Sequence, residues 1–115
     1  MKSTGFAAGL LLMTSIGQSQ TLTTSQARSH DGDKATVCGI VGNEHVAMGS
    51  RGKPTFIDLD SAFPNQVFAI LVWEEDRQKV GALPRTGEHV CATGSINYYH
   101  GVPRIIVRNS TQFNR

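Results

Sequence analysis

The clearest pattern in the chain is a pair of extended segments on either side of a polar corner. From Thr55 to Asp60, apolar or β-branched positions alternate with Phe56 and two aspartates, which is the period of a strand with one buried face. After the corner around Pro64, residues 67–73 are apolar on both faces, as is typical of a strand covered on both sides. The two segments predict adjacent strands in the middle of a sheet or in a closed barrel.

Alternation elsewhere predicts three further strands, and the order of charges predicts one short helix. The five predicted strands span residues 35–42, 52–60, 67–73, 88–98 and 102–108. Residues 74–81 place acidic side chains before basic ones, which favours a short helix because of the helix dipole. Gly39 and Gly42 interrupt the first strand and predict sharp curvature or the close approach of another backbone.

This order of elements defines the predicted fold class. Five strands with one short helix between the third and fourth form the pattern of the oligonucleotide/oligosaccharide-binding (OB) fold, a five-stranded Greek-key barrel. The sequence therefore predicts an all-β OB-fold domain over residues 35–113, and a chain of 115 residues leaves room for only one domain.

The N-terminus has the composition of a secretory signal peptide over residues 1–19. Lys2 lies near the start, residues 6–16 are apolar, and small residues lie at the end. Cleavage after Ser19 would make the protein secreted or periplasmic with no membrane span, and an uncleaved anchor is the alternative. Residues 20–34 are mostly Thr, Ser, Gln, Asp and Gly and predict a flexible leader.

Two cysteines, Cys38 and Cys91, follow the leader. An exported protein meets an oxidising compartment, so an even cysteine count favours a disulfide. The first and fourth strands of an OB fold pair with each other, and alternation puts both cysteines on the outer face of those strands. A bridge between them would stabilise the domain by roughly 3–4 kcal/mol for a loop of about 50 residues. Two buried free thiols are the alternative.

Charge is nearly balanced. The chain has a formal net charge of +2, and loss of Lys2 with the signal peptide would leave ten basic against nine acidic side chains. Proteins that coat long nucleic acids are more often strongly basic, because neutralising phosphates supplies most of the nonspecific affinity. Composition therefore argues against strong nonspecific binding of nucleic acid.

Six stretches of the domain carry one resemblance. They are SRGKPTFIDLD (50–60), FPNQ (63–66), VW (72–73), EDR (75–77), VCATGSI (90–96) and YHGVPRII (99–106). Together they resemble bacterial single-domain OB-fold proteins of the nucleic-acid-binding type, a module that occurs alone after a signal peptide or attached to larger, often nuclease-related proteins. The resemblance covers residues 35–113. It implies binding of single-stranded nucleic acid or oligosaccharide on the second and third strands, framed by the loops after the first and fourth.

Mapping that surface onto the predicted strands gives a candidate nucleic-acid-binding set. Single-strand binding needs cations that follow the phosphates and aromatic faces that stack on bases. The set is Arg51, Lys53, Phe56, Tyr99, Arg104 and Arg108. His100 lies in the same loop as Tyr99, and Tyr98 must point to the opposite face from Tyr99, so only one tyrosine is expected to stack.

Each member of the set also has a purely structural alternative. Phe56 could fill a secondary core, and the two loop cations could be solvated charges. The two strand arginines could pair with Asp58 and Asp60, whose negative charge would also repel a phosphate path. Trp73 ends an apolar strand and is expected in the core.

The sequence contains no complete catalytic or metal-binding motif. The four histidines have no short metal-ligand spacing, which favours four independent surface residues: His30, His45, His89 and His100. Asp58 and Asp60 could hold a divalent ion with Glu74, although alternate exposed carboxylates are ordinary on a strand. Staphylococcal-type nucleases share the fold, but their full acid, arginine and glutamate set is not found here.

The sequence therefore predicts a binding module rather than an enzyme, with no cofactor. The leading hypothesis is weak, low-specificity binding of single-stranded DNA or RNA. The alternative is a module that contacts another protein or a glycan of the cell envelope. A metal-assisted nuclease accessory is the third.

Overall fold

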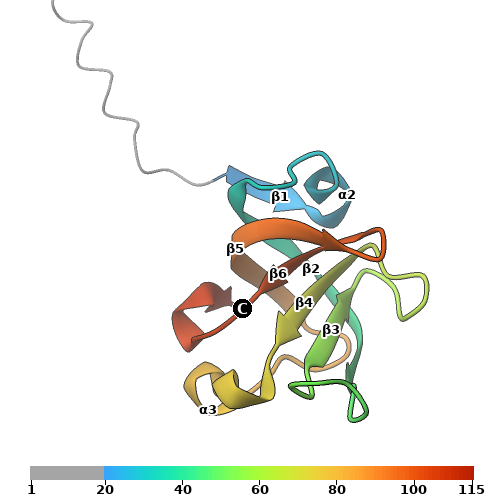
Figure 1. Ribbon diagram of the computed structural model, residues 1–115. Helices are drawn as coiled ribbons and strands as arrows, with labels where there is room; N and C mark the ends of the chain where they lie inside the picture. The colour runs from blue at the N-terminus through green and yellow to red at the C-terminus, as the bar shows by residue number, and fades with distance from the viewer. Residues whose placement is uncertain (1–19) are drawn as a thin grey trace, which may run out of the picture.

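A computed structural model describes residues 20–115, so the expected signal peptide lies outside the described residues. The described residues are mostly β, as the alternation predicts (Figure 1). The strands are β1 (Gln20–Thr23), β2 (Lys34–Val46), β3 (Thr55–Leu59), β4 (Phe68–Val72), β5 (His89–Tyr99), β6 (Val102–Ile106) and β7 (Phe113–Asn114). The helical segments are α2 (Thr24–Ala27), η2 (Glu74–Asp76), α3 (Arg77–Val80) and η3 (Ser110–Gln112). None of these helices is long and apolar enough to cross a membrane.

Five of the strands correspond to the five that the sequence predicts, and they pair in a closed order. β2 pairs with β3, β3 with β4, β4 with β6, β6 with β5, and β5 with β2 again. The β4–β6 pair is parallel and the other four are antiparallel. The inward faces enclose one core, whose largest fully buried side chains are Phe68, Ile57, Leu59, Ile70, Ile96 and Ile105. The helical segment η2–α3 lies between β4 and β5, where the sequence predicts a short helix.

Residues 20–115 contain seven strands rather than the expected five, and one of the two added strands lies in the expected flexible leader. Residues 20–33 form β1, which pairs in parallel with β2, and α2, which packs beside it. Leu22 and Ala27 are buried, and the Thr24 hydroxyl donates a hydrogen bond to Asp60 over 2.5 Å. Two apolar anchors and backbone pairing are enough to order a segment whose composition alone predicts flexibility.

The other added strand, β7, pairs with β5 near the C-terminus. The side-chain amide of Gln112 donates to the carbonyl oxygens of Thr93 and Ile106 over 2.9 and 3.1 Å. These bonds tie the polar C-terminal segment to the sheet, so it also adds to the fold.

Strand β2 is longer than predicted and changes partners along its length. Its first half pairs with β1 and β5, its second half pairs with β3, and the register shifts between Val41 and Asn43. At Gly42, between them, a Cβ would lie 2.5 Å from the backbone carbon of Ser61. The predicted close approach at this glycine is confirmed, and residues 43–46, expected as a loop, extend the strand.

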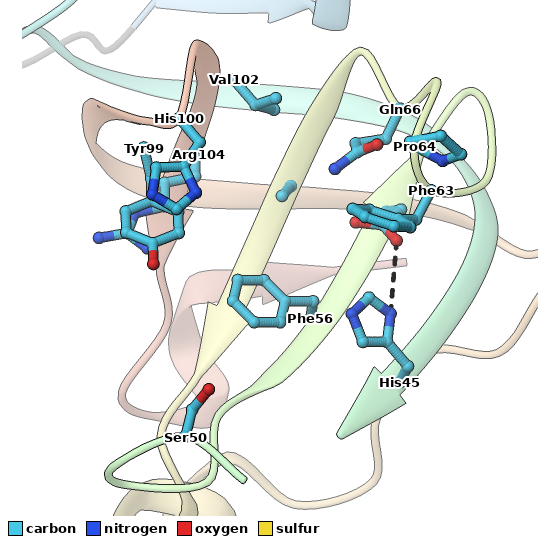
Figure 2. Close-up of a pocket in the computed structure, with 12 residues that line it drawn as sticks. His45, Ser50, Phe56, Phe63, Pro64, Gln66, Tyr99, His100, Val102 and Arg104 are labelled. Carbon is cyan, nitrogen blue, oxygen red and sulfur yellow. Dashed lines mark ion pairs between the residues drawn. The ribbon is translucent and has the colours of Figure 1, made fainter. Parts of the chain in front are cut away.

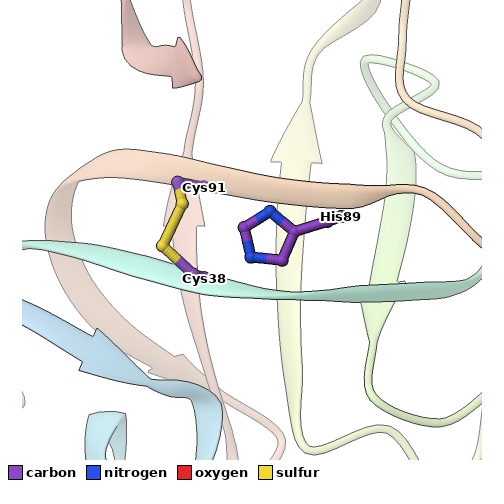
Figure 3. Close-up of side chains that lie close together, drawn as sticks. All are labelled: Cys38, His89 and Cys91. Atoms are coloured by element: carbon purple, nitrogen blue, oxygen red, sulfur yellow. A yellow bond between two sulfur atoms is a disulfide. The ribbon is translucent and has the colours of Figure 1, made fainter. Parts of the chain in front are cut away.

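Cys38 and Cys91 form the expected disulfide (Figure 3). They are direct cross-strand partners of β2 and β5, with Cα atoms 4.0 Å apart, and the bridge closes a sequence separation of 53 residues. The alternative of two free thiols is therefore excluded. A disulfide of this kind fits an oxidising compartment.

Candidate functional site

The outer face of β3, β4 and β6 carries a cavity of about 410 Å³ (Figure 2). Phe56 and Asp58 from β3 and Ala69 from β4 form its floor. One wall is the β5–β6 hairpin, and the opposite wall is the loop of residues 60–67 between β3 and β4. The C-terminal end of β2, with His45, and the loop that follows it, with Ser50, complete the rim. Two stretches distant in sequence, residues 45–69 and 99–104, therefore meet around one hollow.

The hairpin wall is a fixed surface of rings and one cation. His100 and Gly101 both have positive φ, 52° and 81°, as the two-residue turn of a tight hairpin requires. This turn stacks His100 on Tyr99 with ring centroids 3.9 Å apart, and the Arg104 guanidinium lies 4.5 Å from the Tyr99 ring centroid. Arg104 Nε also donates to Asn97 Oδ1 over 2.8 Å. Partial burial lowers the pKa of Arg104, an effect that Tyr99 opposes.

The other side of the cavity contains a buried carboxylate. Asp58 is 0% exposed, and Nδ1 of His45 lies 3.6 Å from its Oδ2 (Figure 2). The His45 ring stacks on Phe56 with centroids 5.4 Å apart and meets Phe63 edge-on at 6.0 Å. Neither oxygen of Asp58 has a hydrogen-bond partner among the described residues. An unpartnered carboxylate on the floor of a cavity is the unusual feature of this site.

Burial is the main influence on the ionisation of Asp58. Desolvation raises its pKa above the usual range, because the charged form loses hydration. Two neighbours partly offset this rise in pKa. The charge of His45 favours the ionised carboxylate, and the dipole of the Phe63 backbone N–H, which lies nearby outside good hydrogen-bond geometry, acts in the same direction. The sequence placed Asp58 correctly on the outer face of β3 but expected it to be exposed. That expectation is wrong because the flanking loop and hairpin cover this face.

A second, smaller hollow of about 230 Å³ adjoins the first and shares Phe56, Tyr99 and Arg104 with it. Arg51 and Trp73 also line this hollow. Trp73, expected in the core, is half-buried with its ring against the backbone of Gly52, where a Cβ would lie 2.9 Å from Cε3. The aromatic surface therefore continues beyond the main cavity towards the loop after β2.

The predicted nucleic-acid-binding set divides in two. The structure brings Phe56, Tyr99 and Arg104 together, with Arg51 beside them. Lys53 is exposed and lines neither hollow. Arg108 lies apart as well: its guanidinium forms an ion pair with the buried carboxylate of Asp76 at 3.3 Å.

Asp58 of β3 and Asp60, which follows the strand, do not form the alternative contacts considered from the sequence. The Asp60 carboxylate accepts hydrogen bonds from Thr24 and from the backbone N–H of Ile40 at 2.9 Å. Asp58 faces His45 instead, so the two carboxylates serve different partners. Neither is paired with Arg104, whose recorded polar partner is Asn97.

Within residues 20–115, one group of three side chains has metal-ligand spacing: Cys38, His89 and Cys91 (Figure 3). Metal ions bind thiolates, and both sulfurs here are joined in the disulfide. The group is therefore a histidine beside a disulfide and gives no candidate metal centre.

Sequence reasoning missed several residues of the main cavity, among them His45, Phe63 and Gln66. The polar composition of residues 43–46 resembles a loop, yet Asn43 and His45 continue the period of two that marks a strand face. That alternation was the available signal for His45. Phe63 and Gln66 belong to the corner between strands, where no periodic pattern shows which way a side chain points.

The adjacent tyrosines point to opposite faces, as alternation requires. The Tyr98 hydroxyl donates to the backbone carbonyl of Arg28, next to α2, whereas Tyr99 faces the cavity.

Comparisons of the chain with models of known protein families, with curated proteins and with solved structures find no match.

Proposed function

We propose that this protein is an exported OB-fold module that binds single-stranded nucleic acid with low sequence specificity. The closed order of β2, β3, β4, β6 and β5 supports the OB assignment, since it has the strand pairing of a five-stranded Greek-key barrel. The composition of residues 1–19 and the disulfide both support export. On this view β1, α2 and β7 are additions to the outside of the barrel.

One observation carries the proposed ligand: Phe56, Tyr99 and Arg104 come from three different strands and gather on a single face. That face lies over β3 and β4, the second and third strands of the proposed barrel, where OB folds bind oligonucleotides. Stacking on an aromatic ring contributes about 1–3 kcal/mol per base, and it tolerates different sequences because every base has a π face.

The same geometry limits the strength of binding. Bases would stack on Phe56 and on the Tyr99–His100 pair, while Arg104 and Arg51 would contact phosphates. Two cations on the face and a nearly neutral chain give little electrostatic attraction. With one or two phosphate contacts, the logarithm of the affinity should fall by about 0.7–1.4 per logarithmic unit of salt.

The proposal is tested by fluorescence anisotropy with a labelled oligothymidylate over a salt series. Arg104→Ala and Arg108→Ala form a matched pair, because both remove an arginine that alternation places on the same face of the last barrel strand. Arg104→Ala should weaken binding by about 1–3 kcal/mol, as expected for a lost charged contact and stacking support. Arg108→Ala should leave the affinity unchanged, since Asp76 engages that side chain away from the cavity. Equal losses in the two variants, or no binding at low salt, would contradict the proposal.

A second candidate, binding of another envelope protein or a glycan, is favoured by exposed apolar side chains, of which Phe63 lines the main cavity. Val46, Met48 and Phe63 are 43, 65 and 63% exposed. Val46 follows His45 directly, and Phe63 contacts the His45 ring. Exposed apolar groups of this kind are common in protein-binding surfaces. Capture of one defined partner that Phe63→Ser abolishes and Arg51→Ala leaves unchanged would favour this candidate.

A further inference from the structure

The cavity floor presents opposite charges on either side of a gap. Strand register aligns one transverse row across the outer face, namely Asn43, Asp58, Ala69, Arg104 and Asn97 from β2, β3, β4, β6 and β5. Ala69 occupies the central position, and its methyl side chain leaves the middle of the row hollow. Strands lie about 4.8 Å apart, so the backbones that carry Asp58 and Arg104 are separated by about 10 Å.

The carboxylate side of this gap has donors nearby but none within hydrogen-bond geometry: Nδ1 of His45 lies 3.6 Å from Asp58 Oδ2, and the backbone N–H of Phe63 is also close. Asp58 lines the cavity but is fully buried, so a ligand can reach its oxygens only when a neighbouring side chain such as Phe63 moves. Neither oxygen has a hydrogen-bond partner within residues 20–115. Gln66, which lines the same cavity, also has a buried side-chain oxygen without a partner. An ionised carboxylate is an acceptor only, and its two oxygens can accept two parallel N–H donors. A ligand that fits here must therefore bring adjacent donors.

The arginine side of the gap lacks acceptors. Arg104 uses Nε to bind Asn97 and rests on the Tyr99 ring, so its orientation is fixed. The structure records no other hydrogen bond for this guanidinium among the described residues, which leaves its terminal N–H groups for a ligand. A ligand that spans the gap must carry an acceptor beside its donors.

The remaining walls favour a flat, uncharged ring. Phe56 lies on the floor beside Asp58, Phe63 faces it from the opposite loop, and Tyr99 closes the hairpin side (Figure 2). The volume of about 410 Å³ lies within the range of small-molecule sites. An organic cation would satisfy Asp58 but would meet the positive charge of Arg104. A planar heterocycle with both donors and an acceptor satisfies both sides.

We infer that this cavity is a guanine subsite within the proposed single-strand surface, with Asp58 accepting from N1–H and the N2 amino group and Arg104 donating to O6. Among the common bases, guanine alone has two adjacent donors next to an acceptor on its Watson–Crick edge. Adenine and cytosine place an unprotonated ring nitrogen beside the amino group, and thymine and uracil have one N–H between two carbonyls. Those edges would turn a lone pair towards the carboxylate.

The inference rests on the proposed function, because it adds one preferred base to a surface that otherwise binds strands without selectivity. The same edge occurs in a strand and in a free guanine nucleotide. The two sources are separated by competition between guanosine monophosphate and an oligonucleotide with one guanine. A strand ligand gains the additional stacking and phosphate contacts around the cavity, so it should compete at a lower concentration.

The experiment uses the full chain with its disulfide formed and measures anisotropy of labelled oligothymidylates whose central base is thymine, guanine, hypoxanthine, adenine or cytosine. The guanine strand should bind about tenfold more tightly than the all-thymine strand, as expected for a good bidentate contact. Hypoxanthine lacks the N2 amino group and should lose most of that gain. Asp58→Asn should reduce the ratio of guanine-strand affinity to all-thymine affinity to near onefold.

Two further variants keep the result interpretable. Asp31→Asn removes one exposed carboxylate away from the cavity and should leave the preference intact. Ala69→Val fills the hollow between Asp58 and Arg104 and leaves both charged side chains in place, so it should also abolish the guanine preference. If Asp58→Asn fails to fold, the Ala69→Val variant tests the guanine subsite by itself.

The possible failures are distinguishable. Binding of all strands with equal affinity would overturn the guanine subsite and leave the proposed function standing, whereas binding of none would remove both. A preference that survives Asp58→Asn and Ala69→Val would also overturn the inference. Displacement by methylguanidinium at lower concentration than by guanosine monophosphate would assign the cavity to a cation instead. Competition by the free nucleotide as strong as by the strand would make the nucleotide the source.

Discussion

Two faces of the domain treat their polar groups differently. On the face that carries the disulfide, polar side chains bind one another: Thr36 and Thr93 hydroxyls lie 2.7 Å apart, and Gln112 satisfies two carbonyls. On the cavity face, Asp58 is buried with both oxygens unpartnered. On the disulfide face, these hydrogen bonds use the polar groups within the protein and stabilise the fold. The cavity face leaves hydrogen-bonding capacity unused inside the protein, which is destabilising unless a ligand uses it.

The largest expected effect tests whether the two faces are separable. Replacing both cysteines by serine, Cys38→Ser with Cys91→Ser, should lower the free energy of unfolding by roughly 3–4 kcal/mol, because the unfolded chain regains the freedom of a long loop. Urea unfolding followed by the fluorescence of Trp73, the chain's one tryptophan, measures the change. Oligonucleotide affinity of the folded double variant should be unchanged. A fold that stays intact by circular dichroism while binding is lost would show that the faces are coupled.

The disulfide face is the part that the sequence predicts well. Pairing of the first and fourth predicted strands, with period-two alternation, is enough to place Cys38 and Cys91 on the same face of neighbouring strands. The structure adds the register that makes them direct partners. Such a prediction needs only the order of strands and the direction in which each side chain points. The direction of each side chain is a local property of an extended backbone, and the strand order follows from the predicted OB topology.

The cavity face was predictable only in part, because coverage is not a local property. Alternation puts Asp58 on the outer face, but the burial of that face depends on a loop and a hairpin that come later in the chain. The same reasoning grouped Arg104 with Arg108, yet Asp76 from the segment after β4 forms an ion pair with Arg108 and not with Arg104. The position of His45 in the cavity could not be recognised from composition, because residues 43–46 have the composition of a loop although they continue β2.

A smaller effect tests the claim that Asp58 is an unmet acceptor. Burial raises its pKa in the folded state, so the folded protein holds this proton where the unfolded chain has released it. Stability contributed by the protonated group is complete below the unfolded pKa, about 3.9, and is lost as pH rises through the higher folded pKa. Asp58→Asn should therefore increase the free energy of unfolding by about 1 kcal/mol at pH 7 and by almost nothing near pH 3.

Urea unfolding at several pH values measures this difference, and Asp31→Asn is the control for loss of one exposed carboxylate. His45 faces Asp58 at 3.6 Å, and Arg104 and His100 also line the cavity, so all three belong in the account of any pH dependence. A variant less stable than the parent protein at pH 7 would mean that Asp58 already has adequate partners in the folded protein.

The smallest expected effect compares two neighbouring hydroxyls on opposite faces. Tyr98→Phe removes the hydrogen bond to the Arg28 carbonyl, which joins β5 to the segment after α2, so it should lower the free energy of unfolding by about 0.5–1.5 kcal/mol. Binding should not change, because Tyr98 lines neither hollow. Tyr99→Phe keeps the ring on which His100 and Arg104 rest, so stability and affinity should both stay within about 0.5 kcal/mol of the parent protein. Thermal melts and anisotropy on the two variants separate a hydroxyl used to hold the fold from a ring used as a surface. A larger stability loss for Tyr99→Phe than for Tyr98→Phe would reverse the assignment of the two faces.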